Sequence, residues 1–247
     1  GSRGNLALPV ERASVPASFP LAAWDTRGHG GPLYGEDYLP ARSIPVDSGR
    51  RSDSQAVALV TMSTELPKPW ITRSRHELYD AQPWLRLYGD DVELPDGRVV
   101  QGFYSIEMPD HAIIVALTHH DQVVVERNYK HGPGQVCVNL PAGYLESGED
   151  PLDAAQRELL EETGYVAEDW SFLGAFVEDG NRGCGRAFIY LARGARLVAE
   201  PASGDLEEMV IDLMTLPELF AAVHRGETPV LGIVAALGLA AEALGTR

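Results

Sequence analysis

The sequence has little cysteine, no long apolar run and few basic residues. Its two cysteines, Cys137 and Cys184, are too few for a disulfide framework and lack the spacing of a metal site. They lead us to expect a reducing, cytoplasmic setting. No apolar run approaches the ~20 residues that a membrane-spanning helix needs, so we expect no membrane partner.

The shortage of positive charge is large, since 20 Lys and Arg stand against 36 Asp and Glu and give a formal net charge of −16. Non-specific nucleic-acid binding depends on cationic side chains that neutralise phosphates, so nucleic acid is not an expected partner. Residues 1 to 61 hold six residues of each sign, which places the acidic excess from Met62 onward. An acidic protein that acts on an anionic substrate needs metal ions between the two.

The chain changes character near Met62. Residues 1 to 61 are rich in Pro, Gly, Ser and Arg and show no helical or strand period. We expect a flexible extension there, or one foreign to the native protein, with Met62 as a candidate start of translation. The predicted division is an extension over 1–61, a small antiparallel N-terminal β-meander over 62–108, and the main domain over 109–247.

Apolar patterns predict the elements of both parts. The meander contains predicted strands at Trp84–Tyr88, Asp91–Leu94 and Val99–Ile106, with a turn at Pro95–Arg98. The main domain contains predicted strands at Ala112–Leu117, Val123–Glu126, Gln135–Leu140, Trp170–Val177, Arg186–Ala192 and Met209–Leu213. Predicted helices follow at Leu216–Arg225 and Val230–Leu244. This order of elements indicates an α/β fold with a mixed sheet.

The stretch from Gly143 to Tyr165 contains an acidic helix with clear ends. Asp150 can cap its start, Pro151 suits its first position, and Gly164 suits the left-handed turn after it. One face carries the cluster Arg157, Glu158, Glu161 and Glu162. Such carboxylates repel one another and attract hard cations such as Mg²⁺ or Mn²⁺. The alternative is an acidic helix face that is simply solvated.

The spacing of this stretch resembles the Nudix box. The matching positions are Gly143, Glu149, Arg157, Glu158, Glu161, Glu162 and Gly164, and Tyr165 departs from the smaller aliphatic residue usual there. The chain is therefore similar to the Nudix hydrolases. That resemblance implies an α/β/α sandwich with a mixed sheet, and metal-dependent hydrolysis of a nucleoside diphosphate linked to another group.

The resemblance also implies roles for single residues. Glu158 and Glu162 are expected to bind Mg²⁺, or Mn²⁺, directly, and Glu161 as a third or water-mediated ligand. The carbonyl of Ala142 completes such sites. Arg157 is expected to orient the glutamates, and Glu149 to support the loop or an outer metal shell. The acidic loop before the last strand supplies a ligand at Glu208. Leu206 stands where a catalytic Glu is frequent, so Asp205 or Glu207 must act as base, or the base lies elsewhere.

Residues from Trp84 to Leu191 resemble the ADP-ribose pyrophosphatase branch. The matching runs are Leu94–Gly97, Val125–Lys130 and Leu140–Gly143. Lys130 replaces the Arg that reaches a phosphate in that branch; the alternative is that it merely ends a strand. A proline common after the box is missing. Arg182 and Arg186 are expected to hold a phosphate or a ribose; the alternative for Arg182 is a solvated loop residue. Of the meander aromatics Trp84, Tyr88 and Tyr104 only one is expected to contact the base, with Trp84 as the candidate, and the others are expected in the core.

Our first hypothesis is hydrolysis of ADP-ribose or a nucleotide sugar into AMP and a sugar phosphate, with the catalytic set Glu161, Glu162, Arg157 and Glu207. The first alternative is a Nudix hydrolase for another nucleotide: a coenzyme, a dinucleoside polyphosphate or a damaged nucleotide. The second is a non-catalytic Nudix-fold module that binds nucleotides. The resemblance further implies a homodimer.

Overall fold

The computed structural model describes residues 66–202, 204 and 208–245. The chain divides into two units, Gly1–Met62 and Ser63–Arg247, and the description below concerns the second. The extension expected for residues 1 to 61 lies outside the described residues. None of the helices in the described part of the chain has the length and the apolar surface that crossing a membrane requires.

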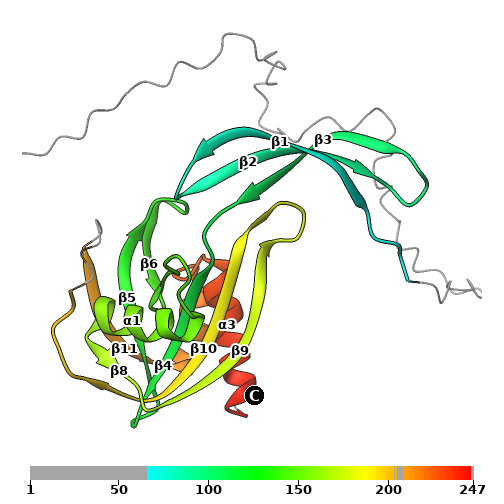
Figure 1. Cartoon of the computed structure of the whole chain (residues 1–247). Coiled ribbons are helices and arrows are strands. Elements are labelled where there is room, and N and C mark those ends of the chain that lie inside the picture. Colours follow the sequence, from blue (N-terminus) through cyan, green and yellow to red (C-terminus); the bar gives the residue numbers. More distant parts are fainter. Residues whose placement is uncertain (1–65, 203, 205–207, 246–247) are drawn as a thin grey trace, which may run out of the picture. The chain divides into compact units, whose positions relative to one another are not determined.

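The first described strands form an antiparallel ribbon, which confirms the meander predicted from the sequence (Figure 1). They are β1 (Ile71–Ala81), β2 (Leu85–Glu93) and β3 (Val99–Glu107). The prediction of two strands at Trp84–Tyr88 and Asp91–Leu94 is wrong, because Gly89 and Asp90 continue the pairing with both neighbouring strands. The sequence does not predict β1, since most of its side chains are exposed and show no apolar alternation.

The ribbon continues into a mixed sheet, where β3 meets β10 in parallel at Ile106 and Gly183. The later strands are β4 (His111–Thr118), β5 (Gln122–Lys130), β6 (Gln135–Asn139), β7 (Ala142–Tyr144), β8 (Tyr165–Val166), β9 (Asp169–Asp179), β10 (Gly183–Leu197) and β11 (Met209–Thr215). Strand β10 runs parallel to β4 and antiparallel to β9, while β5 pairs antiparallel with β6 and β11. The predicted mixed sheet is therefore confirmed.

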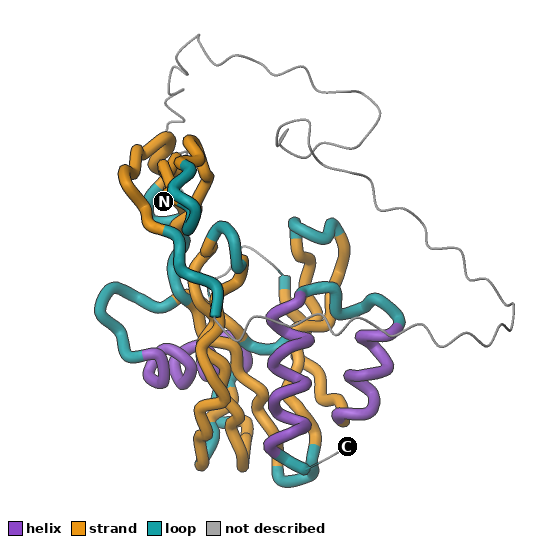
Figure 2. The backbone as a smooth tube through the Cα atoms, turned by 90° about the vertical axis from the view of Figure 1, so that its right-hand side faces the viewer, coloured by secondary structure: helices purple, strands orange, loops and turns teal. Residues whose placement is uncertain are grey.

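Helices cover both faces of this sheet (Figure 2). They are α1 (Pro151–Thr163), α2 (Leu216–His224) and α3 (Leu231–Ala243). Successive residues of β4 alternate between the layers, since Ala112 and Ile114 pack with α1 while Ile113 and Val115 pack with α2 and α3. We call these two sides the α1 face and the α3 face. Burial on both explains the continuous apolar runs and confirms the predicted α/β/α sandwich.

Helix α1 begins and ends where the sequence predicts. The Asp150 side chain accepts a hydrogen bond from the backbone N–H of Leu152 at 2.9 Å, and Pro151 occupies the first turn. Gly164 has a φ of 75° and donates its N–H to the carbonyl of Leu160. These local signals fix the ends of the helix and thus the direction in which its acidic side chains point.

We expect Gly164→Ala to lower the melting temperature more than Gly226→Ala. Both glycines follow a helix with positive φ, 75° and 76°, so alanine adds backbone strain of ~1–2 kcal/mol at either position. A β-carbon on Gly164 would also overlap the carbonyl oxygen of Ala199, whereas nothing lies within 4 Å of a β-carbon on Gly226. Thermal unfolding of both variants measures the difference, and equal losses would contradict the expected collision.

Candidate active site

The guanidinium of Arg157 joins the acidic side chains of α1 to the loop before the helix. Its Nε and Nη2 each donate to Glu149 at 2.9 Å, and its Nη1 donates to Glu158 at 2.7 Å and to Glu161 at 3.2 Å. Nη2 also donates to the backbone carbonyl of Tyr144 at 3.1 Å. Charge-assisted bonds of this kind are stronger than neutral ones, so one cation holds three carboxylates that otherwise repel.

Glu149 is the carboxylate that Arg157 holds most fully. The bonds from Arg157 are the main cause that lowers the pKa of Glu149 from its ordinary 4.5 to about 2, and the backbone N–H of Glu146 adds to the effect at 2.8 Å. Glu149 therefore stays ionised and supports the loop between Gly143 and α1. This geometry agrees with one of the two roles expected for Glu149.

Glu162 is buried between α1 and the sheet, with 7% of its surface exposed. Its carboxylate accepts the backbone N–H of Ala142 at 2.8 Å. Burial, followed by the charge of Glu126 on β5, raises the pKa of Glu162 far above the ordinary value of a glutamate. A divalent cation at this place would lower that pKa again, because a positive charge stabilises both ionised carboxylates.

Gly143 makes room for the carboxylate of Glu158. A β-carbon on Gly143 would overlap that carboxyl group, so only glycine allows the helix side chain to lie against β7. The pairing of Gly143 with Ala112 in β4 fixes the position of this backbone. Gly143 therefore matters for the room that its missing side chain leaves, and not for an unusual backbone φ.

A hard divalent cation fits the chemistry of these residues. The side-chain donors are carboxylates throughout, and the Glu158 side chain is only 13% exposed beside the space that Gly143 leaves. Mg²⁺ and Mn²⁺ prefer such oxygen donors. Within the described residues, no three His, Cys, Asp or Glu side chains already form a metal-binding group; Glu158 and Glu161 contact Arg157 instead.

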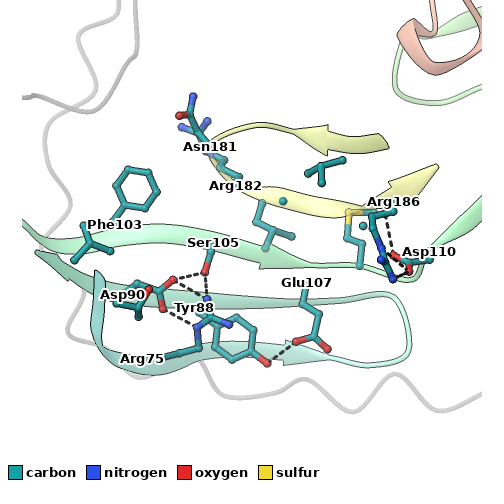
Figure 3. Close-up of a pocket in the computed structure, with 17 residues that line it drawn as sticks. Arg75, Tyr88, Asp90, Phe103, Ser105, Glu107, Asp110, Asn181, Arg182 and Arg186 are labelled. Atoms are coloured by element: carbon teal, nitrogen blue, oxygen red, sulfur yellow. Dashed lines mark hydrogen bonds and ion pairs between the residues drawn. The ribbon is translucent and has the colours of Figure 1, made fainter. Parts of the chain in front are cut away.

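A pocket of about 500 Å³ lies between the ribbon and the tip of the β9–β10 hairpin (Figure 3). Arg75 lines it with both Nε and Nη2 bound to Asp90, at 2.7 and 2.9 Å, and with its guanidinium 4.8 Å from the centre of the Tyr88 ring. Ser105 donates to the same Asp90 at 2.7 Å. Arg75 is the main cause that lowers the pKa of Asp90, which is 3% exposed. The wall is therefore pre-organised and carries a half-exposed, planar guanidinium.

The two arginines predicted to bind substrate both line this pocket, but their guanidinium groups differ in their contacts. Arg186 donates to Asp110 through Nε at 3.1 Å and Nη2 at 2.7 Å, and it lies over the Phe188 ring. Arg182 approaches Asp179 only at 3.8 Å. Arg182 is thus better able to bind a ligand, whereas Arg186 is engaged in an ion pair.

The remaining predicted site residues are more scattered. Lys130 ends β5, where strand alternation places it on the same face as Glu126. Trp84 lies in the turn between β1 and β2, is 64% exposed and does not line the pocket. Glu208 is exposed just before β11, and Glu207 lies outside the described residues.

Sequence reasoning missed Glu126 and the group around Arg75. Glu126 is 2% exposed and ends the apolar run Val123–Val125, so an acid in a strand predicted to be buried was a usable signal. Arg75 lies on β1, which shows no periodic pattern. Its partner Asp90 follows Gly89, where the sequence suggests a gap between two strands. No sequence signal pointed to that pair.

Two family models match the chain. The model described as NUDIX domain matches residues 108–231, about half of the chain. The model described as nucleoside diphosphate sugar hydrolase N-terminal domain matches residues 70–104, which contain β1, β2 and most of β3.

Similar proteins carry several names. The methanol dehydrogenase activator of Bacillus methanolicus is 34% identical over 132 residues, which cover 53% of this chain and 70% of that protein. The ADP-ribose pyrophosphatase of Bacillus subtilis is 31% identical over 142 residues, covering 57% and 76%. A solved structure titled as an ADP compounds hydrolase superposes with a TM-score of 0.65 at 17% identity, over 74% of this chain and 100% of that one, which confirms the fold.

We expect Gly143→Ala to weaken Mn²⁺ binding by about tenfold or more, because the new methyl group displaces the carboxylate of Glu158. Isothermal titration calorimetry measures the affinity. Gly132→Ala is the matched control, since nothing lies within 4 Å of a β-carbon there. Equal Mn²⁺ affinity in the two variants would contradict the assignment of Glu158 to the cation.

We expect Glu149→Gln to lower the free energy of unfolding at about pH 7 and to lose this effect in acid. The folded-state pKa of about 2 lies below the ordinary 4.5, so the ionised Glu149 stabilises the fold above about pH 4.5, and that stability is lost as the pH falls toward 2. Urea unfolding at several pH values tests this against Glu242→Gln, which alters an exposed glutamate of α3. A difference from wild type that persists unchanged at about pH 3 would contradict it.

Proposed function

We propose, on the premise that this chain belongs to the Nudix hydrolase family, that it cleaves the diphosphate of ADP-ribose or a nucleotide sugar. Water adds across one P–O bond of the diphosphate and yields AMP and a sugar phosphate. The names of the similar ADP-ribose pyrophosphatases support the choice of substrate. The match of the ribbon to a nucleoside diphosphate sugar hydrolase domain supports it too.

The observation that carries this proposal is the set of carboxylates around Arg157 and Gly143. Arg157 fixes Glu158 and Glu161 by hydrogen bonds, while the N–H of Ala142 on β7 fixes the buried Glu162. Glu162 is buried close to the equally buried acid Glu126, a pair that is costly to fold and is characteristic of a site that receives a cation.

We propose that Glu158, Glu161, Glu162, Glu208 and the carbonyl of Ala142 hold Mg²⁺, with Mn²⁺ as a substitute. When bound, the ion neutralises the diphosphate oxygens and supports attack by water. Arg157 keeps Glu158 and Glu161 oriented. Glu207 is our proposed general base; it lies outside the described residues, so its role rests on the family resemblance.

The pocket of the ribbon is proposed to receive the end of the substrate beyond the diphosphate. Asp90 occupies Nε and Nη2 of Arg75 and Tyr88 lies on one face of the guanidinium, so the other face suits stacking of a planar base. Arg182 offers donors to a phosphate or to sugar hydroxyls from the opposite wall. Lys130 is proposed as a phosphate contact. Trp84 is a weaker candidate for the base contact because it lies outside the pocket lining.

The assembly and the compartment belong to the same proposal. We propose a homodimer, on the family resemblance, and a cytoplasmic location, because Cys137 and Cys184 are both free thiols. A non-catalytic binding module is disfavoured, since the glutamates of the box are all present in the sequence.

The test is turnover on ADP-ribose, ADP-glucose, GDP-mannose, NADH and dinucleoside polyphosphates, with and without Mg²⁺. Metal-dependent preference for ADP-ribose or a nucleotide sugar supports the proposal. Preference for NADH or a dinucleoside polyphosphate favours the alternative Nudix substrates. Binding without turnover on any compound favours the binding module.

We expect Glu162→Gln to reduce turnover by about 100-fold or more with the fold retained, because glutamine keeps the acceptor for the Ala142 N–H but loses the anionic ligand. Steady-state kinetics and thermal unfolding measure the two effects. Glu242→Gln makes the same chemical change on an exposed part of α3 and serves as the control. Near-normal turnover in Glu162→Gln would refute the metal assignment.

A further inference from the structure

Asp110, directly before β4, and His111, the first residue of β4, hold the hairpin that forms one wall of the pocket. Asp110 accepts the backbone N–H of Arg186 on β10 at 2.9 Å, together with the guanidinium of the same residue. His111 approaches Glu178 on β9, with 3.4 Å between Nε2 and Oε1. Successive residues of a strand point to opposite faces, so the hairpin is held from the α1 face and from the α3 face.

The contact on the α3 face involves a third element. The Oε1 atom of Glu178 lies 3.5 Å from the place of a β-carbon on Gly232, in the first turn of α3. Helix α3 starts without a side-chain cap, and a carboxylate beside a helix N-terminus is electrostatically favourable. Glu178 therefore connects β9, β4 and α3 at one point.

From His111 the contacts continue to β7 and then to Arg157 on α1. His111 is paired with Tyr144 across β4 and β7, and the two rings meet edge to face at 6.3 Å and 83°. The carbonyl of Tyr144 accepts from Arg157. Glu178, His111, Tyr144 and Arg157 thus form a chain of direct contacts.

In the other direction the contacts lead into the pocket. Asp179, next to Glu178, accepts the backbone N–H groups of Asn181 at 2.8 Å and Arg182 at 2.6 Å and so shapes the tip of the hairpin. Asn181 and Arg182 line the pocket, whereas Glu178 and His111 do not (Figure 3). A substitution at Glu178 therefore reaches the pocket only by moving the hairpin.

We propose that Glu178 and His111 are positioning residues that hold the pocket wall in register with β7 and the Arg157 side chain that binds it. Their contact sets the distance between the part of the site that receives the diphosphate and the part that receives the rest of the substrate. The proposal rests on the proposed function, because register matters only if one molecule occupies both parts. A displacement of the pocket wall by even a fraction of an ångström weakens the binding of a correctly placed substrate.

The test uses Glu178→Gln, which removes the charge of the carboxylate, and His111→Phe, which removes the ring nitrogens, each with a side chain of similar shape. We expect KM to rise about tenfold in each variant, with kcat within about twofold of wild type, and the double variant to match the single ones. Mn²⁺ affinity stays at the wild-type value. An unchanged KM, a fall in kcat alone, or additive effects in the double variant would overturn the proposal.

The matched controls are Glu242→Gln on the exposed part of α3 and His120→Phe in the exposed turn after β4, both expected to leave KM unchanged. Hydrogen–deuterium exchange provides a readout without substrate. Glu178→Gln is expected to speed exchange both in residues 179–186 and in residues 143–145, and no change in the second segment would overturn the contact chain. If the wild type cleaves no diphosphate compound, the proposed function fails while this exchange experiment still decides the coupling.

Discussion

Repulsion between carboxylates on neighbouring turns of one helix is the constraint that shapes the site. Arg157 relieves it by giving hydrogen bonds to Glu149, Glu158 and Glu161 from a single planar fork, a geometry that a lysine does not reproduce. The same guanidinium binds the carbonyl of Tyr144, so the helix, the preceding loop and β7 are tied together. The precise cap of α1 and the bare backbone of Gly143 are the local conditions that let this arrangement form.

Much of the fold could be predicted from the sequence, because the sequence signals for its helices and strands are local or periodic. The ends of α1 follow from Asp150, Pro151 and Gly164, and the two-sided burial of β4 follows from an unbroken apolar run. The continuity of β2 could not be predicted, because Gly89 and Asp90 are held in the strand only by their pairing with β1 and β3. Local residue chemistry therefore predicts that a helix or strand forms, whereas pairing with residues far along the chain decides how far a strand extends.

The same distinction between local and long-range contacts applies to the candidate site. Spacing along a helix brings Arg157 close to Glu161 and Glu158 close to Glu162, so the sequence indicates their proximity directly. Glu126 comes from another strand, and its approach to Glu162 depends on how the sheet packs under α1. The distinction between Arg182 and Arg186 depends on Asp110, which lies 76 residues before Arg186 and whose pairing with it no spacing rule reveals.

The ribbon of β1, β2 and β3 is joined to the main sheet where Ile106 meets Gly183 and donates its N–H to the carbonyl of Arg182. The pocket lies along this junction, with one wall from each side (Figure 3). The carboxylates of α1 belong to the main domain, away from that joint. The pocket and the carboxylates of α1 therefore rest on different elements, so a substitution in the ribbon can change what the pocket admits and leave those carboxylates in place.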